Sequence, residues 1–179
     1  MSHPTDANCI FCKIVAGQIP SFKLLEDDKT IAFMDINPVN PGHSLSVAKG
    51  HWPMVDTIPT DVLGAVAATA QKVAKAVMSE LKPHGVNLLQ ANGPGAGQSV
   101  PHLHIHIMPR RPNDGVALNW EYRPGDKAEI EAIYKRLKAA MLLMIKQLKK
   151  RKLFLVITRT MIKTWVKLKV MTRSSLVCV

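Results

Sequence analysis

Hydrophobic and polar residues alternate most strictly in the segment HLHIHIM, residues 102–108. Side chains in a β-strand point to opposite faces in turn. The pattern therefore predicts a strand with His102, His104 and His106 on one face and aliphatic residues on the other. An aliphatic face is ordinary core material. Three imidazoles in a row are not, and they indicate a functional face.

The rest of residues 1–140 shows patterns typical of alternating strands and helices. Period-two segments and turn residues predict strands near 22–26, 30–34, 44–49 and 86–90, besides the histidine strand. A short helix is expected near 10–16, a long one from an N-cap at Thr60 to a stop at Pro83 and Gly85, and another from about 126 past 140. The fold class predicted is α+β, with an antiparallel sheet of about five strands and two main helices.

The apolar stripe predicted for the long helix follows i, i+3, i+4 spacing, at positions 63, 66, 67, 70, 73, 74, 77 and 81. The segment 37–43 is predicted to be a loop, because its two prolines and one glycine exclude it from the sheet, and the strand 44–49 follows it.

Charge is distributed very unevenly along the 179 residues, which carry a formal net charge of +11. Residues 1–140 hold 14 Lys and Arg against all 13 Asp and Glu, whereas 141–179 hold 10 basic residues and no acid. Two regions follow, a domain over 1–141 and a basic C-terminal tail over 142–179. The tail is interpreted as a non-native or disordered extension in preference to a membrane-surface or nucleic-acid arm, and contact with either partner is expected only through it.

The sequence predicts a cytoplasmic protein. It begins without a basic region followed by a long apolar run, and no segment approaches the roughly 18 apolar residues of a membrane span. Three cysteines, two of them in the segment CIFC, do not form a secreted disulfide framework. In a reducing compartment, such a C-x-x-C pair indicates either zinc ligands or two free, packed thiols.

Three explanations compete for the histidine row: hydrogen-bonded structural residues, metal ligands, or a nucleophile with orienting neighbours. The glycine-rich segment NGPGAGQS, just upstream, favours the third. Glycines allow backbone N–H groups to turn inward and bind an anion. A nucleophilic imidazole beside a phosphate-binding loop is the resulting prediction. His43 and His84 are interpreted as structural or exposed.

The segment HLHIHIM also fits the His-φ-His-φ-His-φ-φ motif (φ, hydrophobic) of the histidine triad (HIT) superfamily. The segments CIFCKI, IPSFKLLEDD, AFMDINPVNPGH and GQSVPHLHIHIMPR resemble its Hint-like branch, so that the resemblance covers roughly residues 9–140. It implies a HIT fold and hydrolysis or transfer of purine nucleoside phosphoramidates or aminoacyl-adenylates through a nucleotidyl-histidine intermediate.

The resemblance also implies roles for individual residues. His104 would be the nucleophile, His106 would donate to a phosphate oxygen, and Ser99 and Gln98 would contact the phosphate or leaving group. Asp35 would bind the ribose hydroxyls, and the base would lie between apolar walls formed by Phe11, Ile14, Phe33 and Ile36. Ala91 stands where many Hint relatives have an asparagine, which leaves Asn92 as the sugar-side candidate.

The chemistry needs no cofactor, because the nucleophile is a nitrogen and fixed donors hold the phosphate. A structural zinc is expected at Cys9 and Cys12, completed by His51 and His102, as in related HIT proteins. The resemblance further implies a homodimer. Alternatives are a dinucleoside polyphosphate hydrolase of the Fhit kind, a nucleotide-binding adaptor acting through the tail, and a metal-dependent hydrolase using the three histidines.

Overall fold

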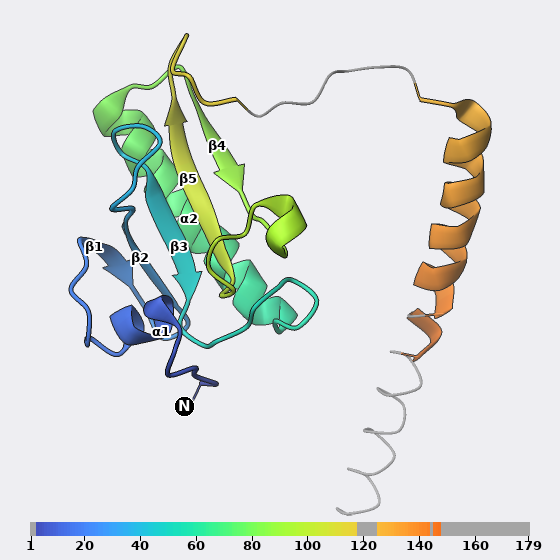
Figure 1. Ribbon diagram of the computed structural model, residues 1–179, viewed down its shortest axis with the longest axis horizontal. Helices are drawn as coiled ribbons and strands as arrows, with labels where there is room; N and C mark the ends of the chain where they lie inside the picture. The colour runs from blue at the N-terminus through green and yellow to red at the C-terminus, as the bar shows by residue number, and fades with distance from the viewer. Residues whose placement is uncertain (1–2, 118–124, 144, 148–179) are drawn as a thin grey trace, which may run out of the picture. The chain divides into compact units, whose positions relative to one another are not determined.

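The computed structural model describes residues 3–117, 125–143 and 145–147, in two compact units, Met1–Leu118 and Asn119–Val179 (Figure 1). In the described parts of both units, no helix combines the length and apolar character needed to cross a membrane. The expected tail lies outside the described residues from position 148 onward.

The first unit is a five-stranded antiparallel sheet with a helix on each face (Figure 1). This confirms the predicted α+β class. The strands lie in the order β1-β2-β3-β5-β4. The elements are α1 Ile10–Val15, β1 Lys23–Glu26, β2 Thr30–Met34, β3 Ser44–Ala48, α2 Thr60–Leu81, β4 Gly85–Leu89, the 3-10 turn η1 Pro94–Ala96 and β5 His104–Arg110.

The two faces of the sheet bury different sets of side chains. Ile107 of β5 and Ala32 of β2 pack with Ala70, Val73 and Val77 of α2. On the other face, α1 packs through buried apolar side chains against Phe33, Leu45 and Val47. His104 pairs with Val47 and His106 with Leu45, so both histidines share the α1 face, as alternation predicts.

Helix α2 differs from its prediction at both ends and along its stripe. Thr60 is the first helical residue and Pro59 is the N-cap, without a side-chain cap bond. The buried positions are Val62, Val66, Thr69, Ala70, Val73 and Val77, whereas 67 and 81 are exposed. A pattern of apolar residues does not include Thr69, because threonine is polar. Its side chain can be buried because its hydroxyl is hydrogen-bonded to Thr30 Oγ1, 2.8 Å away in the core.

The helix stop also works differently from expected. Lys82, with φ 45° and ψ 52°, is the left-handed C-cap, and Gly85 already belongs to β4. A glycine is common at such a position, but Pro83 prevents the helix from continuing whichever residue precedes it.

The second unit contains a helix over 127–143 and 145–147, so that the predicted helix from about 126 past 140 is confirmed. The expected boundary after residue 141 falls inside it. Its apolar side chains are exposed within this unit, including Ile130, Ile133, Leu137 and Met141 at helical spacing.

Candidate functional site

The histidine face of the sheet borders a cavity of about 390 Å³. Helix α1, the segment 19–21, the end of β2, the residues 99–100 and β5 contribute its walls. Both His104 and His106 line it, together with Asp35, Ser99 and the fourth histidine, His43. The topology explains this gathering, because β3 and β5 are adjacent, with Leu45 opposite His106, and His43 directly precedes β3.

Four consecutive contacts link the imidazoles into one chain. Val39 N–H donates to His43 Nδ1 (3.2 Å), and His43 Nε2 lies 3.0 Å from His106 Nδ1. His106 Nε2 lies 3.1 Å from His104 Nε2, and His104 Nδ1 lies 2.6 Å from the carbonyl oxygen of His102.

Only one assignment of protons satisfies this chain with neutral rings. A backbone carbonyl can only accept, so His104 carries its proton on Nδ1 and its lone pair on Nε2. A backbone N–H can only donate, so His43 carries its proton on Nε2 and donates to His106 Nδ1. His106 then donates from Nε2 to His104 Nε2. The chain thus places an unprotonated nitrogen of His104 beside the cavity and a donor of His106 next to it.

Burial keeps these rings neutral at physiological pH. Desolvation lowers the pKa of His104, although the bond to the His102 carbonyl and the Asp35 charge oppose it. Desolvation, with the neighbouring His104 and His43, lowers the pKa of His106 to about 4. Desolvation also lowers the pKa of His43. A neutral imidazole is the form that can attack an electrophile.

Asp35 ends the wall formed by β2. Its Oδ1 accepts from the Asn37 backbone N–H (2.8 Å), and its Oδ2 lies 3.6 Å from His43 Nδ1. The side chain is 17% exposed, which leaves its carboxylate accessible to a bound hydroxyl group.

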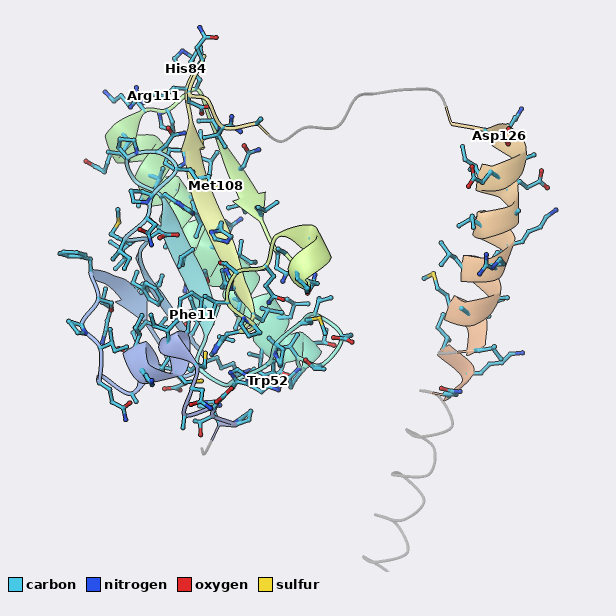
Figure 2. The ribbon with its side chains drawn as sticks, in the orientation of Figure 1. Phe11, Trp52, His84, Met108, Arg111 and Asp126 are labelled. Carbon is cyan, nitrogen blue, oxygen red and sulfur yellow. The ribbon has the colours of Figure 1, made fainter. Side chains whose placement is uncertain are left out.

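The apolar residues expected around a base do surround the cavity. Phe11, labelled in Figure 2, lies edge-on to Phe33 at a centroid distance of 5.7 Å and to His104 at 5.1 Å. Ile14 and Ile36, the other two apolar residues expected around the base, also line the cavity, and Ile36 is 75% exposed at its rim. The rim position of such a large apolar side chain suits contact with a ligand.

Two expected site residues do not line the cavity. Gln98 Nε2 donates to the Pro53 carbonyl (2.6 Å), and its Oε1 accepts from Gly93 N–H (2.7 Å). Asn92 Oδ1 accepts from Val55 N–H (2.8 Å). Both side chains hold the glycine-rich loop in shape, whereas Ser99 alone of the three reaches the cavity wall.

Cys9, Cys12, His51 and His102 form a second cluster next to the histidine chain, with all four ligand atoms within 4.8 Å of one another. Sulfur–nitrogen separations are 3.3 Å for Cys9–His102, 3.5 Å for Cys12–His51 and 3.6 Å for Cys12–His102. Ordinary Zn–S and Zn–N bonds in a tetrahedron give about 3.6 Å for this edge. The cluster therefore has dimensions that fit a zinc ion.

The chemistry of the donors fits as well. His102 Nε2 donates to the Ala48 carbonyl (2.7 Å), so Nδ1 has its lone pair toward the thiols. Desolvation, with the charges of His51 and His104, lowers the pKa of His102 to about 4 despite that bond, which keeps the ring neutral. Burial raises the pKa of Cys12, and a thiol in this position must lose its proton when a metal binds.

His43 is a residue of the cavity that the sequence did not single out. Its position before a strand in NPGH predicts a structural or exposed residue; it is 3% exposed, lines the cavity and contacts His106. The available signal was the strand pairing: a histidine next to strand 44–49 can meet the histidine strand only if these strands are neighbours. His84, by contrast, lies with Arg111 at the far end of the unit from Phe11 (Figure 2).

Comparison with known proteins gives consistent matches. The family model for the HIT domain matches residues 16–113. The chain is 42% identical over 137 residues to "Protein hit" of Bacillus subtilis, covering 73% of this chain and 94% of that protein. It is 38% identical over 144 residues to the adenosine 5′-monophosphoramidase HNT1 of Saccharomyces cerevisiae, covering 79% and 89%. A zinc-bound histidine triad protein from Mycobacterium smegmatis aligns with a TM-score of 0.59 at 31% identity, covering 74% and 97%.

Proposed function

The chain belongs to the HIT domain family, and from this premise we propose that it is a hydrolase of purine nucleoside phosphoramidates or aminoacyl-adenylates. The observation that carries the proposal is the histidine chain, which presents the unprotonated Nε2 of His104 to a cavity with an accessible carboxylate and apolar walls. The name of the yeast relative supports an adenosine phosphoramidate as substrate.

In the first step, His104 Nε2 attacks the α-phosphorus, and the bond from phosphorus to the amine or acyl oxygen breaks. The leaving group departs with the electron pair and takes a proton from the neighbouring donor, the Ser99 hydroxyl or His106 Nε2–H. Water then attacks the same phosphorus and returns a proton to that donor. The phosphorus–Nε2 bond breaks with its electron pair left on nitrogen, which releases the nucleoside monophosphate and the free imidazole. His106 Nε2–H and the Ser99 hydroxyl are the donors proposed for the phosphate or leaving group.

Asp35 is proposed to accept hydrogen bonds from the ribose hydroxyls. The base is proposed to lie between the apolar side chains of Phe11, Ile14, Phe33 and Ile36. Asn92 and Gln98 are proposed to act through the loop that carries Ser99, since their own polar groups are used within it.

We further propose a structural zinc at Cys9, Cys12, His51 and His102, supported by the fit of the cluster and by the zinc-bound mycobacterial neighbour. A bound zinc would fix His102, whose backbone carbonyl orients His104, and the protein's own residues would carry the reaction. We propose a cytoplasmic location as well, because cysteines that bind zinc must stay reduced, as they do in a reducing compartment.

A homodimer through β4 is proposed as well. Strand β4 is an outer strand of the sheet, and Leu88 and Leu89 on it are 52% and 38% exposed. Leu88→Lys should yield monomers in sedimentation, while Leu24→Lys on the opposite edge should not.

Steady-state hydrolysis of three substrates tests the activity: adenosine 5′-monophosphoramidate, a lysyl-adenylate and a diadenosine polyphosphate. We expect kcat/KM to be highest for one of the first two and to fall by several orders of magnitude in His104→Ala. Preference for the diadenosine polyphosphate would favour the Fhit-like alternative instead. Nucleotide binding without turnover of any substrate would favour the adaptor.

A further inference from the structure

The segment before α1 packs against the zinc-fitting cluster and supplies contacts beyond its four ligands. We propose that Asp6 is a positioning residue of this site, which orients His51 through its carboxylate and holds Cys12 through its backbone N–H. The inference rests on the proposed zinc site. Residue 6 lies outside the residues 16–113 that the family model matches.

Asp6 contacts two of the four candidate ligands from the outer side. Its Oδ2 lies 3.7 Å from His51 Nε2, and its backbone N–H points at Cys12 Sγ, 3.4 Å away. The first distance is longer than a hydrogen bond, so this contact is mainly electrostatic. The second is an ordinary N–H···S contact, of the kind that stabilises a thiolate.

The backbone around Asp6 fixes the position of its carboxylate. Asp6 Oδ1 accepts from Asn8 N–H (2.8 Å), and the Asp6 carbonyl accepts from Cys9 N–H (3.2 Å). One carboxylate oxygen is therefore held in a turn that leads directly into the C-x-x-C segment, which leaves the other directed at His51.

The same segment also holds the backbone next to His51. His51 N–H donates to the Pro4 carbonyl at 2.7 Å. At Gly50, an added Cβ would clash with the Trp52 ring and lie 3.2 Å from Pro4 Cδ, a tight contact, so the two chain segments pack closely here. Pro4 thus contacts the backbone of His51, and Asp6 contacts its imidazole ring.

The consequence concerns which nitrogen of His51 is free to bind a metal. Nδ1 faces Cys12 Sγ at 3.5 Å, and Nε2 faces the Asp6 carboxylate. The negative charge of Asp6 beside Nε2 favours the tautomer with its proton on that nitrogen, which leaves the Nδ1 lone pair for the ion, and the same charge favours binding of a cation. The other histidine, His102, obtains the same help from the Ala48 carbonyl, which substitution cannot remove. The Asp6 carboxylate is therefore an outer contact that a substitution can remove.

Zinc affinity of the full-length protein, measured by competition with a chromophoric chelator, tests the inference. Asp6→Asn keeps the oxygen that accepts from Asn8 and removes the charge, and it should weaken zinc binding about 10-fold. Asp6→Ala removes both and should weaken it toward 100-fold. The matched control is Glu80→Gln, which removes the charge of another exposed acid. Glu80 lines a groove with Gly42 and Ser44, at the end of β3 opposite Ala48, whose carbonyl contacts the zinc-fitting cluster. Its affinity should equal that of wild type.

Cobalt substitution adds a readout that does not depend on affinity. Thiolate-to-cobalt absorption should appear in wild type and Asp6→Asn at one ion per chain, and it should disappear in Cys12→Ser. Equal zinc affinities for wild type and both Asp6 variants, or equal losses in Asp6→Asn and Glu80→Gln, would overturn the role of Asp6 and leave the zinc site standing. A wild-type protein that binds no zinc would overturn the site itself and this inference with it.

Discussion

His43 should control catalysis by fixing the proton of a residue that itself faces the substrate. Its Nε2–H donates to His106 Nδ1 at 3.0 Å, and its Nδ1 accepts from the Val39 N–H at 3.2 Å. Without the first bond, His106 can move its proton to Nδ1. Its Nε2 would then present a lone pair to His104, and it could no longer donate to a phosphate.

Two amide substitutions separate the two bonds of His43. His43→Asn places an acceptor near the position of Nδ1 but has no donor that reaches His106. His43→Gln places its amide nitrogen near the position of Nε2 and retains that donor. Leaving a buried acceptor unpaired costs about 1–3 kcal/mol. If that cost appears in the transition state, kcat falls about 5- to 150-fold in His43→Asn. His43→Gln should stay much closer to wild type.

The assay combines kcat and KM for adenosine 5′-monophosphoramidate with nitrogen-15 NMR of the histidine rings. Wild type and His43→Gln should show His106 protonated on Nε2, and His43→Asn should show the other tautomer at least in part. KM should change little, because His43 acts on the substrate through the proton of His106. Equal kcat values for the two variants, or an unchanged His106 tautomer in His43→Asn, would refute the reasoning.

Three further perturbations follow from the same site. Asp35→Asn should raise KM about 10-fold through weaker bonds to the ribose, and the penalty should vanish for a 2′,3′-dideoxy substrate; an equal penalty on both would contradict the assigned role. In the pH profile of kcat/KM, the loss of activity toward acid should lie below pH 6.5. Burial lowers the pKa of His104 and holds that of His106 near 4, so protonation removes the active form only at lower pH. A loss of activity that already occurs at or above pH 6.5 would argue against buried neutral rings. Removing zinc should lower Tm, since free zinc at 100 times Kd stabilises the fold by about 2.7 kcal/mol, and calorimetry with a chelator should show no shift if no zinc binds.

Much of the fold followed from local patterns in the chain. Alternation over 102–108 placed His104 and His106 on one face because period two leaves no other choice. His102 precedes β5, which begins at His104, yet its ring still points away from Leu103 toward the thiols. Alternation therefore held two residues beyond the strand itself.

Contacts that depend on which strands are neighbours, and on the hydrogen-bond partners of polar side chains, could not be predicted from the sequence. His43 joined the site because β3 pairs with β5, a pairing between residues some sixty positions apart. Thr69 joined the buried face of α2 only because Thr30 supplies its partner. Gln98 looked like a phosphate ligand by motif, but its amide is bonded to Pro53 and Gly93.

The central claim is that His104 Nε2 forms a covalent bond to phosphorus, and trapping that adduct tests it most directly. Zinc-loaded protein would be mixed with less than one equivalent of an adenosine phosphoramidate, quenched in base within one turnover and analysed by peptide mass spectrometry. The account predicts an adenylyl group on His104 that forms and decays at the rate of turnover and is absent in His104→Ala. Turnover in His104→Ala at the wild-type rate, or an adduct on another residue, would contradict it.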